Sequence, residues 1–352
     1  MDSPELFIPN MHGRFTGVSA SAAAVTRAHA DMFDLRLVGR PLPGCSGPIG
    51  IWRALELART PPPGRSFSIW HVRRNEEMRA ALFARSVLGL PIRIVFTSAA
   101  QRRHSLWPRF LIGRMDAVIA TTDEAAKHVG NVRAVVPHGV DVDRFHPALD
   151  RAAAWAATGF PGTIGIAAIG RIRPEKGTDR FVAAMISALP GMPDVTALVI
   201  GRAAPEHLRF LARLKADVAA AGLSKRILFP GEIPPDEMPG LVRGLSLLVA
   251  LPRYEGYGLT PLEAMASGVP FVASDAGHFD QFSTNGAVGE IVPDGDVTLA
   301  SLKIKALLGD ARRHAHMAQA ARQRAVSDFS VQTEARAISE VYRTLWAESG
   351  QA

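Results

Sequence analysis

The sequence has a single cysteine, Cys45. One cysteine excludes an internal disulfide and a cysteine-based metal cluster, and it favours the reducing cytoplasm as the place of action. The first residues, MDSPELFIPNMHG, lack a basic stretch followed by an apolar core. No run reaches the roughly 18 apolar residues of a membrane span. We therefore expect a chain that is neither exported nor integral to a membrane.

Two nucleotide-binding motifs are also missing. No G-x-G-x-x-G follows an apolar run, because GRFTGVSA has the wrong spacing and IGRIRPEKG and VIGRAAPE lack the pattern. No G-x-x-x-x-G-K-[ST] occurs either. Each motif supplies the turns and backbone N–H groups that hold phosphates in its own class of enzyme. Their absence disfavours a dinucleotide-dependent dehydrogenase and a P-loop nucleoside triphosphatase.

Acidic residues are scarce in part of the first half. Residues 51–114 hold 12 arginines, three glutamates and no lysine. Residues 1–150 carry 19 basic and 13 acidic residues, whereas residues 151–352 carry 21 and 20. Arginine makes planar, bidentate contacts with phosphate and carboxylate, so the first half is predicted to meet an anionic partner. The residues predicted to bind this acceptor are Arg73, Arg74, Arg102 and Arg103.

The length and composition indicate two domains. The chain has 352 residues, of which 47% are apolar, with 31 glycines and 25 prolines. This length suits two domains of roughly 150 to 200 residues each, and the composition suits a soluble α/β protein. Residues 137–150 are rich in proline, glycine and aspartate and are interpreted as the connection. We expect an N-terminal domain over 1–150, a C-terminal domain over 151–330, and a helix over 331–352 that packs back toward the N-terminal domain.

Short apolar runs alternate with helical patterns in both halves. Runs of strand length occur at 5–10, 67–74, 92–98 and 116–122, and again at 163–171, 197–202, 226–231, 245–252 and 268–274. This alternation predicts parallel sheets with helices on both faces. The predicted fold class is therefore α/β, with two Rossmann-like domains facing each other across a cleft. Ligands in such sheets bind beyond the carboxyl ends of the strands.

The stretch LPRYEGYGLTPLEAMASGVPFVAS (251–274) predicts a glycine loop and a short helix between two buried strands. Thr260 is expected at the N-cap of this helix and Gly268 at its end. Glu263 follows Thr260 by three residues. It has two interpretations, as the glutamate of a capping box or as a ligand-binding group.

The loop before this helix is a candidate anion site. Gly256 and Gly258 allow the backbone to approach a ligand closely, and a helix N-terminus attracts phosphate. Glu255 would repel phosphate, so we expect it to bind sugar hydroxyls instead. A second anchor is AIGRIRPEKG (168–177), in which Arg171 and Lys176 follow a strand. Two cations at that point would neutralise a diphosphate and stabilise it as a leaving group.

These motifs resemble those of the retaining glycosyltransferases of family 4, which have the two-domain B-type fold. The resemblance spans nearly the whole chain and includes PHGVD (137–141), GRIRPEKG (170–177) and EGYGLTPLEAMASGVP (255–270). The stretches TGVSAS, IWHVRRNEEM and FTSAAQRRHSLWPRFLIGRMDAVIATT further resemble the alphaproteobacterial mannosyltransferases of lipopolysaccharide core assembly. The resemblance implies transfer of mannose from GDP-mannose, with its anomeric configuration kept and without a metal or other cofactor. It also implies an inner-core acceptor that bears Kdo carboxylates.

The resemblance implies roles for individual residues. Arg171 and Lys176 would bind the donor diphosphate, Glu255 the sugar hydroxyls and Glu263 the ribose, with the base near residues 230–233. The other implied donor contacts are Gly17, Gly170, Gly231, Ile233, Gly256, Tyr257, Gly258, Leu259 and Thr260. Many family members carry a histidine directly after the strand at 92–98, where this chain has Thr97 and Ser98. Either His104 or His71 is therefore expected to join Glu255, Arg171 and Lys176 at the catalytic centre.

The chain departs from the family pattern at two further positions. The usual asparagine before GVD is His138, and the usual second glycine after the strand at 268–274 is His278. Asp141 and Asp143 have the D-x-D spacing of a divalent metal site, but they match the connection motif. No metal ligand is predicted, because Arg171 and Lys176 already supply positive charge.

The expected partners are a nucleotide sugar, a lipid-linked anionic saccharide and, peripherally, the cytoplasmic face of a membrane. No nucleic acid is expected, because aromatic residues for base stacking make up only 7% of the chain. Three alternatives stay open. They are a UDP-sugar-dependent glycosyltransferase of polysaccharide synthesis, a nucleotide-sugar epimerase, and an arginine-rich nucleic-acid-binding protein.

Overall fold

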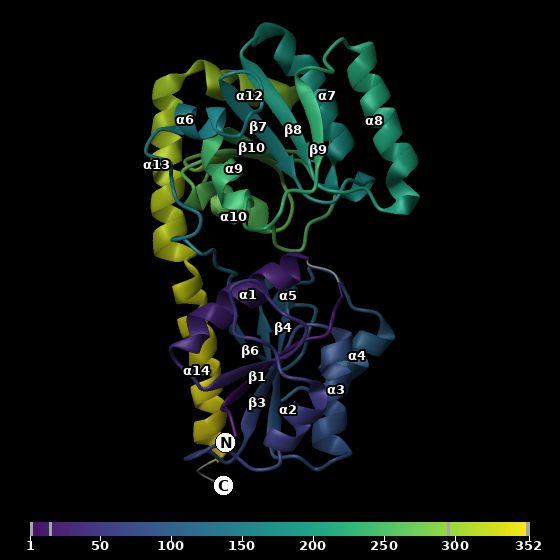
Figure 1. Cartoon of the computed structure of the whole chain (residues 1–352), viewed down its shortest axis with the longest axis vertical. Coiled ribbons are helices and arrows are strands. Elements are labelled where there is room, and N and C mark those ends of the chain that lie inside the picture. The colour runs from purple at the N-terminus through teal and green to yellow at the C-terminus, as the bar shows by residue number, and fades with distance from the viewer. Residues whose placement is uncertain (1–2, 14–15, 294–295, 350–352) are drawn as a thin grey trace. The chain divides into compact units, whose positions relative to one another are not determined.

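Two six-stranded parallel sheets organise the chain, which the computed structural model describes over residues 3–13, 16–293 and 296–349. Each sheet belongs to one of two units. Unit 1 comprises residues 1–139 and 331–352, and unit 2 comprises residues 140–330. Helices lie on both faces of each sheet (Figure 1). The α/β class and the two Rossmann-like sheets predicted from the alternation of elements are confirmed.

The division between the units lies earlier than the sequence suggested. The predicted break at 150 moves to between Gly139 and Val140. The reason is that Val142 and Phe145 are buried in the core of unit 2, so the connection is already part of that unit. Residues 331–352 belong to unit 1, where helix α14 (Val331–Ser349) packs against α1 (Gly17–Ala30) (Figure 1).

Unit 1 has the strand order β2-β1-β3-β4-β5-β6. Its strands are β1 (Leu6–Asn10), β2 (Leu35–Gly39), β3 (Ser68–Val72), β4 (Ile92–Ser98), β5 (Ala117–Ala120) and β6 (Val132–Val135). Besides α1 and α14, its helices are α2 (Ile51–Leu57), α3 (Asn75–Ser86), α4 (Leu106–Ile112) and α5 (Asp123–Ala126).

Successive strand residues of unit 1 point to opposite faces and build two cores. Leu6 and Ile8 face the core that includes α1 and α14, whereas Phe7 between them faces the core that includes α2, α3 and α4. Burial of both faces explains why these strands appear in the sequence as continuous apolar runs.

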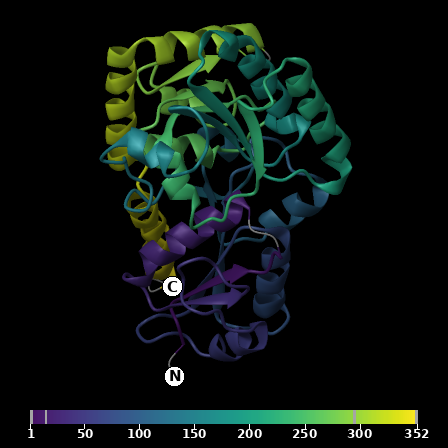
Figure 2. The same cartoon turned by 45° about the horizontal axis from the view of Figure 1, so that its top comes forward.

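Unit 2 has the strand order β12-β11-β10-β7-β8-β9. Its strands are β7 (Ile164–Ile169), β8 (Val195–Ile200), β9 (Ile227–Gly231), β10 (Leu245–Ala250), β11 (Phe271–Ser274) and β12 (Gly289–Val292). Its α-helices are α6 (Arg151–Ala156), α7 (Thr178–Ala188), α8 (Leu208–Ala220), α9 (Met238–Gly244), α10 (Leu259–Ala266), α11 (Phe279–Ser283), α12 (Val297–Gly309) and α13 (Ala311–Asp328). Figure 2 shows helices on both sides of these strands.

The two faces of the second sheet also pack against different helices. Ala167 on β7 faces a core that includes α6, α9 and α10, and its neighbour Ile166 faces a core that includes α7, α8 and α12. The first core requires a close approach between α6 and β7. A Cβ at Gly165 would lie 2.2 Å from the Trp155 ring, so only glycine fits there.

Three strands escaped the sequence analysis, and all three lie at sheet edges. They are β2, β6 and β12. An edge strand is short and partly exposed, as the alternating exposure of Val132–Val135 illustrates. It therefore lacks the continuous apolar run by which buried strands are recognised. No helix among the described residues has the length and apolar character required to cross a membrane.

Candidate active site

The carboxyl ends of β7 and β10 lie side by side in unit 2. These strands pair directly, and the chain leaves β7 toward β8 and β9 on one side and leaves β10 toward β11 and β12 on the other. Such a reversal leaves a crevice between the two loops that follow the strands, where open α/β sheets bind their ligands. The loops are residues 170–177 after β7 and residues 251–258 after β10. They contain the two sequence motifs identified above.

Glycine allows these two loops to touch along their backbones. Gly177 has φ +66°, and a Cβ there would lie 1.7 Å from the carbonyl oxygen of Leu251. The backbone N–H of Arg253 donates to the Glu175 carbonyl at 2.9 Å. The Arg253 guanidinium also donates to both carboxylate oxygens of Asp179, at 2.8 and 2.6 Å. The two loops are therefore held together by main-chain and side-chain hydrogen bonds.

Lys176 and Glu255 form an ion pair across these loops. The Nζ of Lys176 lies 2.5 Å from Oε2 of Glu255, and the two side chains are 26% and 19% exposed. The other carboxylate oxygen of Glu255 accepts the backbone N–H of Gly256 at 3.1 Å. Arg171, in the loop that follows β7, is exposed. Two of the predicted catalytic residues thus meet in space, although 79 positions separate them in sequence.

A row of glycines ends three neighbouring strands at the same edge of the sheet. Gly170 follows β7, Gly201 follows β8 and Gly231 ends β9, with φ values of +150°, +137° and +88°. Gly170 donates to the Ile200 carbonyl at 2.9 Å, and Gly201 donates to Gly231 at 2.8 Å. Chain neighbours aside, no heavy atom of the described residues lies within 4 Å of the place of a Cβ at Gly170 or Gly231, so a ligand can approach their backbone, whereas a Cβ at Gly201 would lie 1.9 Å from the Gly170 carbonyl oxygen. Gly170 and Gly231 were predicted donor contacts, whereas Gly201 in VIGR was missed.

The first turn of α10 differs from the prediction. The helix begins at Leu259 and its N-cap is Gly258, so Thr260 is not the N-cap. Gly258 adopts φ +102°, and a Cβ there would lie 2.0 Å from the Phe279 ring. Glycine can make this turn two residues before the position at which threonine would have capped the helix. No side chain caps the N-terminus of α10.

The observed start of α10 changes the role assigned to Glu263. Because the helix starts at Leu259, Glu263 lies too far along it for a capping box, so the capping interpretation is wrong. Its half-buried carboxyl group has no hydrogen bond with the rest of the described chain. Burial raises the pKa of Glu263 to about 7, and Arg144 opposes this shift without cancelling it. A carboxyl group in this state is suited to accept hydroxyl donors from a ligand.

The end of α10 follows the prediction at Gly268. This residue has φ +65° and follows Ser267, the C-cap of the helix. Its N–H donates to Met265 at 2.9 Å, and the next N–H, of Val269, donates to Ala264 at 2.8 Å. These two hydrogen bonds make a Schellman motif, which fixes where the chain leaves α10 for β11.

Tyr257 and His278 form a stacked pair beneath the glycine loop. Their rings lie 5.1 Å apart at an interplanar angle of 13°, and the His278 N–H donates to the Tyr257 carbonyl at 2.9 Å. Gly277 has φ +61°, and a Cβ there would lie 2.6 Å from the same carbonyl. His278, which replaces a glycine of the family pattern, therefore packs under the loop that carries Glu255. Tyr257 is 4% exposed and belongs to the core of unit 2, so its ring supports the loop from below.

In unit 1, the two histidines considered for contact with the reacting sugar have different surroundings. His71 on β3 is fully buried. Its Nδ1 lies 2.5 Å from the Tyr342 hydroxyl and its Nε2 lies 2.7 Å from the Thr97 hydroxyl. Burial, with nearby Arg73, lowers the pKa of His71 well below its ordinary value. Both ring nitrogens are occupied, so a contact between His71 and sugar is ruled out.

His104 has the better position. It lies half-buried in the loop after the carboxyl end of β4, with Nε2 3.4 Å from the Ser98 hydroxyl. Burial lowers the pKa of His104, and Arg102 and His128 act in the same direction. The imidazole is therefore neutral at pH 7 and able to accept or donate a hydrogen bond. Its contact with the reacting sugar stays a prediction.

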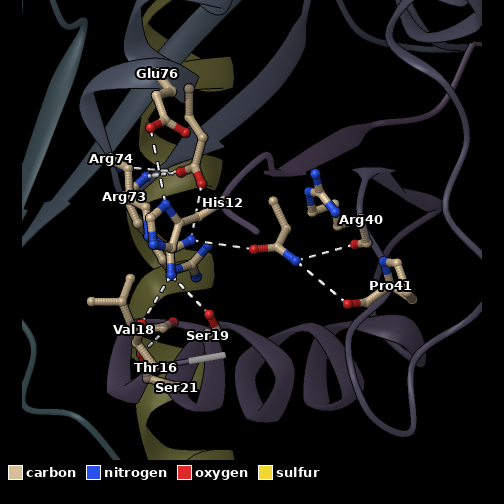
Figure 3. Close-up of polar contacts among 12 residues, drawn as sticks. His12, Thr16, Val18, Ser19, Ser21, Arg40, Pro41, Arg73, Arg74 and Glu76 are labelled. Atoms are coloured by element: carbon tan, nitrogen blue, oxygen red, sulfur yellow. Dashed lines mark hydrogen bonds and ion pairs between the residues drawn. The ribbon is translucent and has the colours of Figure 1, made fainter. Parts of the chain in front are cut away.

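Arg74 is held inside unit 1 (Figure 3). Its guanidinium donates to the hydroxyls of Thr16 and Ser19, at 3.2 and 2.8 Å, and to Asn10 and Glu77, both at 3.2 Å. Its side chain is only 15% exposed. The expected acceptor contact of Arg74 is therefore replaced by a structural role, in which it joins the start of α1 to the start of α3.

The other residues predicted in unit 1 have different surroundings. Arg73 is half-buried, and its buried Nη1 has no hydrogen-bond partner among the described residues. Arg102 and Arg103 are exposed in the loop after β4. Gly17 is the exposed first residue of α1, and the two residues 14–15 shortly before it lie outside the described part of the chain.

The D-x-D pair in the connection has a local structural explanation. Asp141 accepts the backbone N–H of Arg144 at 3.0 Å. Within the described ranges, no group of three or more His, Cys, Asp or Glu side chains is arranged to hold a metal ion. Lys176, paired with Glu255, and the exposed Arg171 are cations at the candidate site in unit 2.

Comparisons with known proteins identify the family of the chain. Residues 158–324 match the family model described as glycosyl transferases group 1. The chain is 41% identical over 345 residues to the lipopolysaccharide core biosynthesis mannosyltransferase LpsB of Rhizobium meliloti, covering 97% of both chains. It is 40% identical over 346 residues to the lipopolysaccharide core biosynthesis mannosyltransferase LpcC of Rhizobium leguminosarum bv. viciae, covering 98% of this chain and 97% of that protein.

Solved structures resemble the chain as well. The C-terminal domain of a group 1 glycosyl transferase, LpcC from Francisella tularensis, is 36% identical with a TM-score of 0.54 and covers 55% of this chain and 100% of that domain. Anabaena HepE in complex with UDP and glucose has a TM-score of 0.82 and covers 96% of this chain and 99% of that one. At 16% identity, the HepE likeness bears on the fold alone.

Proposed function

The chain belongs to the group 1 glycosyltransferases and, within them, to the family of the lipopolysaccharide core mannosyltransferases. We therefore propose that it transfers mannose from GDP-mannose to an anionic core acceptor. The observation that carries the proposal is the Lys176–Glu255 ion pair at the β7/β10 crevice. A cation for the diphosphate and a carboxylate for the sugar hydroxyls are adjacent there.

The donor would lie against unit 2 with its diphosphate at Lys176, Arg171 and the uncapped N-terminus of α10. These groups would stabilise the negative charge that develops on the departing GDP. Glu255 would exchange part of its contact with Lys176 for hydrogen bonds from the mannose hydroxyls. Glu263 would accept the ribose hydroxyls, and Gly231 to Ile233 would line the base. These roles supply the needed charge without a metal ion or other cofactor.

The reaction proposed for this site keeps the anomeric configuration. The bond between mannose C1 and the phosphate oxygen breaks, and a bond from C1 to the acceptor hydroxyl oxygen forms on the same face of the sugar. The acceptor proton passes to an oxygen of the departing GDP phosphate, so atoms and charge balance. No protein nucleophile is required, and the protein contributes orientation and electrostatic stabilisation. Exclusion of water from the site would favour transfer over hydrolysis.

We propose that the acceptor is lipid-linked and that the enzyme works at the cytoplasmic face of the inner membrane. The basic residues of unit 1 support an acceptor that bears carboxylates or phosphates, with Arg102 and Arg103 as exposed candidates. Nucleic acid has no part in this proposal.

The test is calorimetric titration with GDP, UDP, GDP-mannose and UDP-glucose in the presence of EDTA. We expect selective binding of the guanine compounds. Lys176→Ala should weaken GDP binding roughly tenfold or more, because a charge-assisted contact is lost. Glu255→Ala should weaken GDP-mannose but leave GDP nearly unchanged, because its carboxylate contacts the sugar. Lys225→Ala, which changes an exposed lysine of the same unit, is the matched control.

Preference for the uridine compounds would contradict GDP-mannose as donor, and unchanged GDP binding by Lys176→Ala would contradict the proposed site. A second step uses a Kdo-terminated acceptor. Release of GDP only when the acceptor is present supports a transferase, whereas conversion of the donor sugar without an acceptor would indicate an epimerase. Loss of binding in EDTA that Mg²⁺ restores would contradict metal independence.

A further inference from the structure

Helix α4 (Leu106–Ile112) exposes three large apolar side chains of unit 1. Leu106 is 81% exposed, Trp107 53% and Phe110 48%, whereas Leu111 and Ile112 on the same helix are buried in the core. The Trp107 and Phe110 rings stack at 5.5 Å with an interplanar angle of 13°. We call Leu106, Trp107 and Phe110 the α4 ridge. So much apolar surface is unfavourable in water unless another surface covers it.

The neighbouring helix adds exposed apolar residues. Helix α3 packs against α4 (Figure 1). Phe83 on α3 is 47% exposed, and Val87 and Leu88 directly after it are 69% and 45% exposed. Both helices of this packed pair therefore present large apolar side chains to the outside of unit 1.

The surroundings of the ridge are strongly basic. Residues 101–114 contain four arginines and no acidic residue. The guanidinium of Arg114 lies 3.6 Å from the centre of the Phe110 ring. The guanidinium groups of Arg103 and Arg109 make no hydrogen bond or ion pair with the rest of the described chain. Such unpaired cations attract anions from solution.

Arg103 and Arg109 also line a pocket of about 410 Å³ beside α4. Ile112, Lys127 and His128 contribute to the same pocket. Glu124 and Asp123 are the acidic neighbours, and the Glu124 carboxylate lies 2.7 Å from Lys127 Nζ and 3.3 Å from His128 Nε2. Two carboxylates stand against the three permanent cations Arg103, Arg109 and Lys127, so the pocket keeps a positive charge.

We propose that the α4 ridge inserts into the interfacial layer of a bilayer that contains anionic phospholipid, while Arg103 and Arg109 bind lipid phosphates at the adjoining pocket. Tryptophan, phenylalanine and leucine next to arginine form the pattern by which peripheral proteins bind an anionic membrane surface. The uncompensated positive charge around the ridge matches such a surface. The biological meaning of this contact rests on the proposed function, because a lipid-linked acceptor is presented by the membrane, but the contact can be measured without sugar transfer.

The experiment is co-sedimentation of the full chain with vesicles of phosphatidylcholine alone or with about 30 mol% phosphatidylglycerol. We expect binding to the anionic vesicles and little to the neutral ones. The double variant Trp107→Ser/Phe110→Ser should bind roughly tenfold or more weakly. Arg109→Gln should bind about fivefold more weakly, and its binding should depend less on salt. Trp52→Ser, which changes an 80% exposed tryptophan on α2 of the same unit, should bind like the wild type.

Two further measurements separate this inference from its rivals. GDP-mannose titration of the ridge double variant should match the wild type, because the donor site lies in unit 2. Loss of vesicle binding by this variant supports the inference even if no GDP-mannose is bound. The inference is overturned if the wild type does not bind anionic vesicles, or if the double variant binds them as tightly as the wild type. It is also overturned if sedimentation velocity shows that the wild type is a dimer and the ridge double variant a monomer, while both bind vesicles equally.

Discussion

At the residue scale, Glu263 is a buried polar group that destabilises the free protein and that a ligand could stabilise. Its carboxyl group is half-buried and lacks a hydrogen-bonding partner in the described chain. Burial raises the pKa of Glu263 to about 7. The charged form is therefore disfavoured until donors arrive, and ribose hydroxyls would be such donors.

The pH dependence of stability follows from this pKa. The pKa of Glu263 is higher in the folded state than its ordinary value of 4.5. The group therefore contributes to the free energy of unfolding below about pH 4.5, and this contribution is lost as the pH rises through about 7. Glu263→Gln should therefore raise the free energy of unfolding at about pH 8 by about 2 kcal/mol, with no gain at about pH 4.5. Urea unfolding at both pH values measures this difference. The same variant should bind GDP-mannose more weakly.

The control for this prediction is Glu232→Gln, which changes an exposed glutamate of the same unit. We expect it to alter the unfolding free energy by less than about 0.5 kcal/mol at either pH. A Glu263→Gln variant that is less stable than the wild type at pH 8 would show that the carboxylate stabilises the free protein.

At the element scale, α14 completes the core of unit 1 after the chain has built all of unit 2. The Tyr342 hydroxyl contacts Nδ1 of His71, and Trp346 Nε1 donates to the Phe67 carbonyl at 3.0 Å. Glu334 accepts both His138 Nδ1 at 2.8 Å and the Gly139 N–H at 2.7 Å. This last contact fixes the start of α14 to the end of the N-terminal part of unit 1. His138, which replaces an asparagine of the family pattern, thus has a structural partner.

Removing the Tyr342 hydroxyl tests this docking. Tyr342→Phe keeps the ring but leaves the buried His71 Nδ1 without a partner, so we expect a loss of about 1–2 kcal/mol in the free energy of unfolding. Chemical unfolding followed by circular dichroism measures the loss. GDP binding should not change, because Tyr342 belongs to unit 1. Arg343→Ala, on an exposed position of the same helix, should be nearly neutral. Equal stability of Tyr342→Phe and wild type would show that the hydrogen bond contributes nothing to docking.

At the scale of the whole molecule, the two units carry different charge. Unit 1 holds 20 lysine and arginine residues against 13 acidic ones, and unit 2 holds 20 against 20. The entire net charge of +7 therefore lies in unit 1, which also bears the α4 ridge and the predicted acceptor arginines. Unit 2, which bears the candidate donor site, has local cations within a balanced whole. Long-range attraction of an anionic acceptor or surface should thus come from unit 1.

This asymmetry predicts different salt dependences for the two substrates. Between about 50 and 300 mM NaCl, KM for the anionic acceptor should rise about fivefold or more, because screening weakens long-range attraction. KM for GDP-mannose should change about twofold or less, because its contacts are short and local. Steady-state kinetics with a water-soluble core acceptor measures both values. Parallel increases in the two constants would contradict the assignment of the acceptor to unit 1.

Local amino-acid patterns were enough to predict features that depend on a few neighbouring residues. Continuous apolar runs marked the strands that are buried on both faces, and Gly268 marked the end of α10, because a left-handed residue there favours glycine. The edge strands β2, β6 and β12 and the true start of α10 were missed, since these edge strands have no continuous apolar run and the helix is capped by Gly258, two residues before Thr260.

Which side chains contact one another, and which are buried, depends on how the elements pack. Lys176 and Glu255 pair because β7 and β10 are neighbours in the sheet, and His71 is lost as a site residue because α14, 271 positions away, covers it. The same holds for the unit boundary, which moved to Gly139 because Val142 and Phe145 are buried in unit 2. Local patterns report the preferences of the backbone and of one face of an element. Burial and partnership depend on which elements pack together, and those elements lie far apart in the sequence.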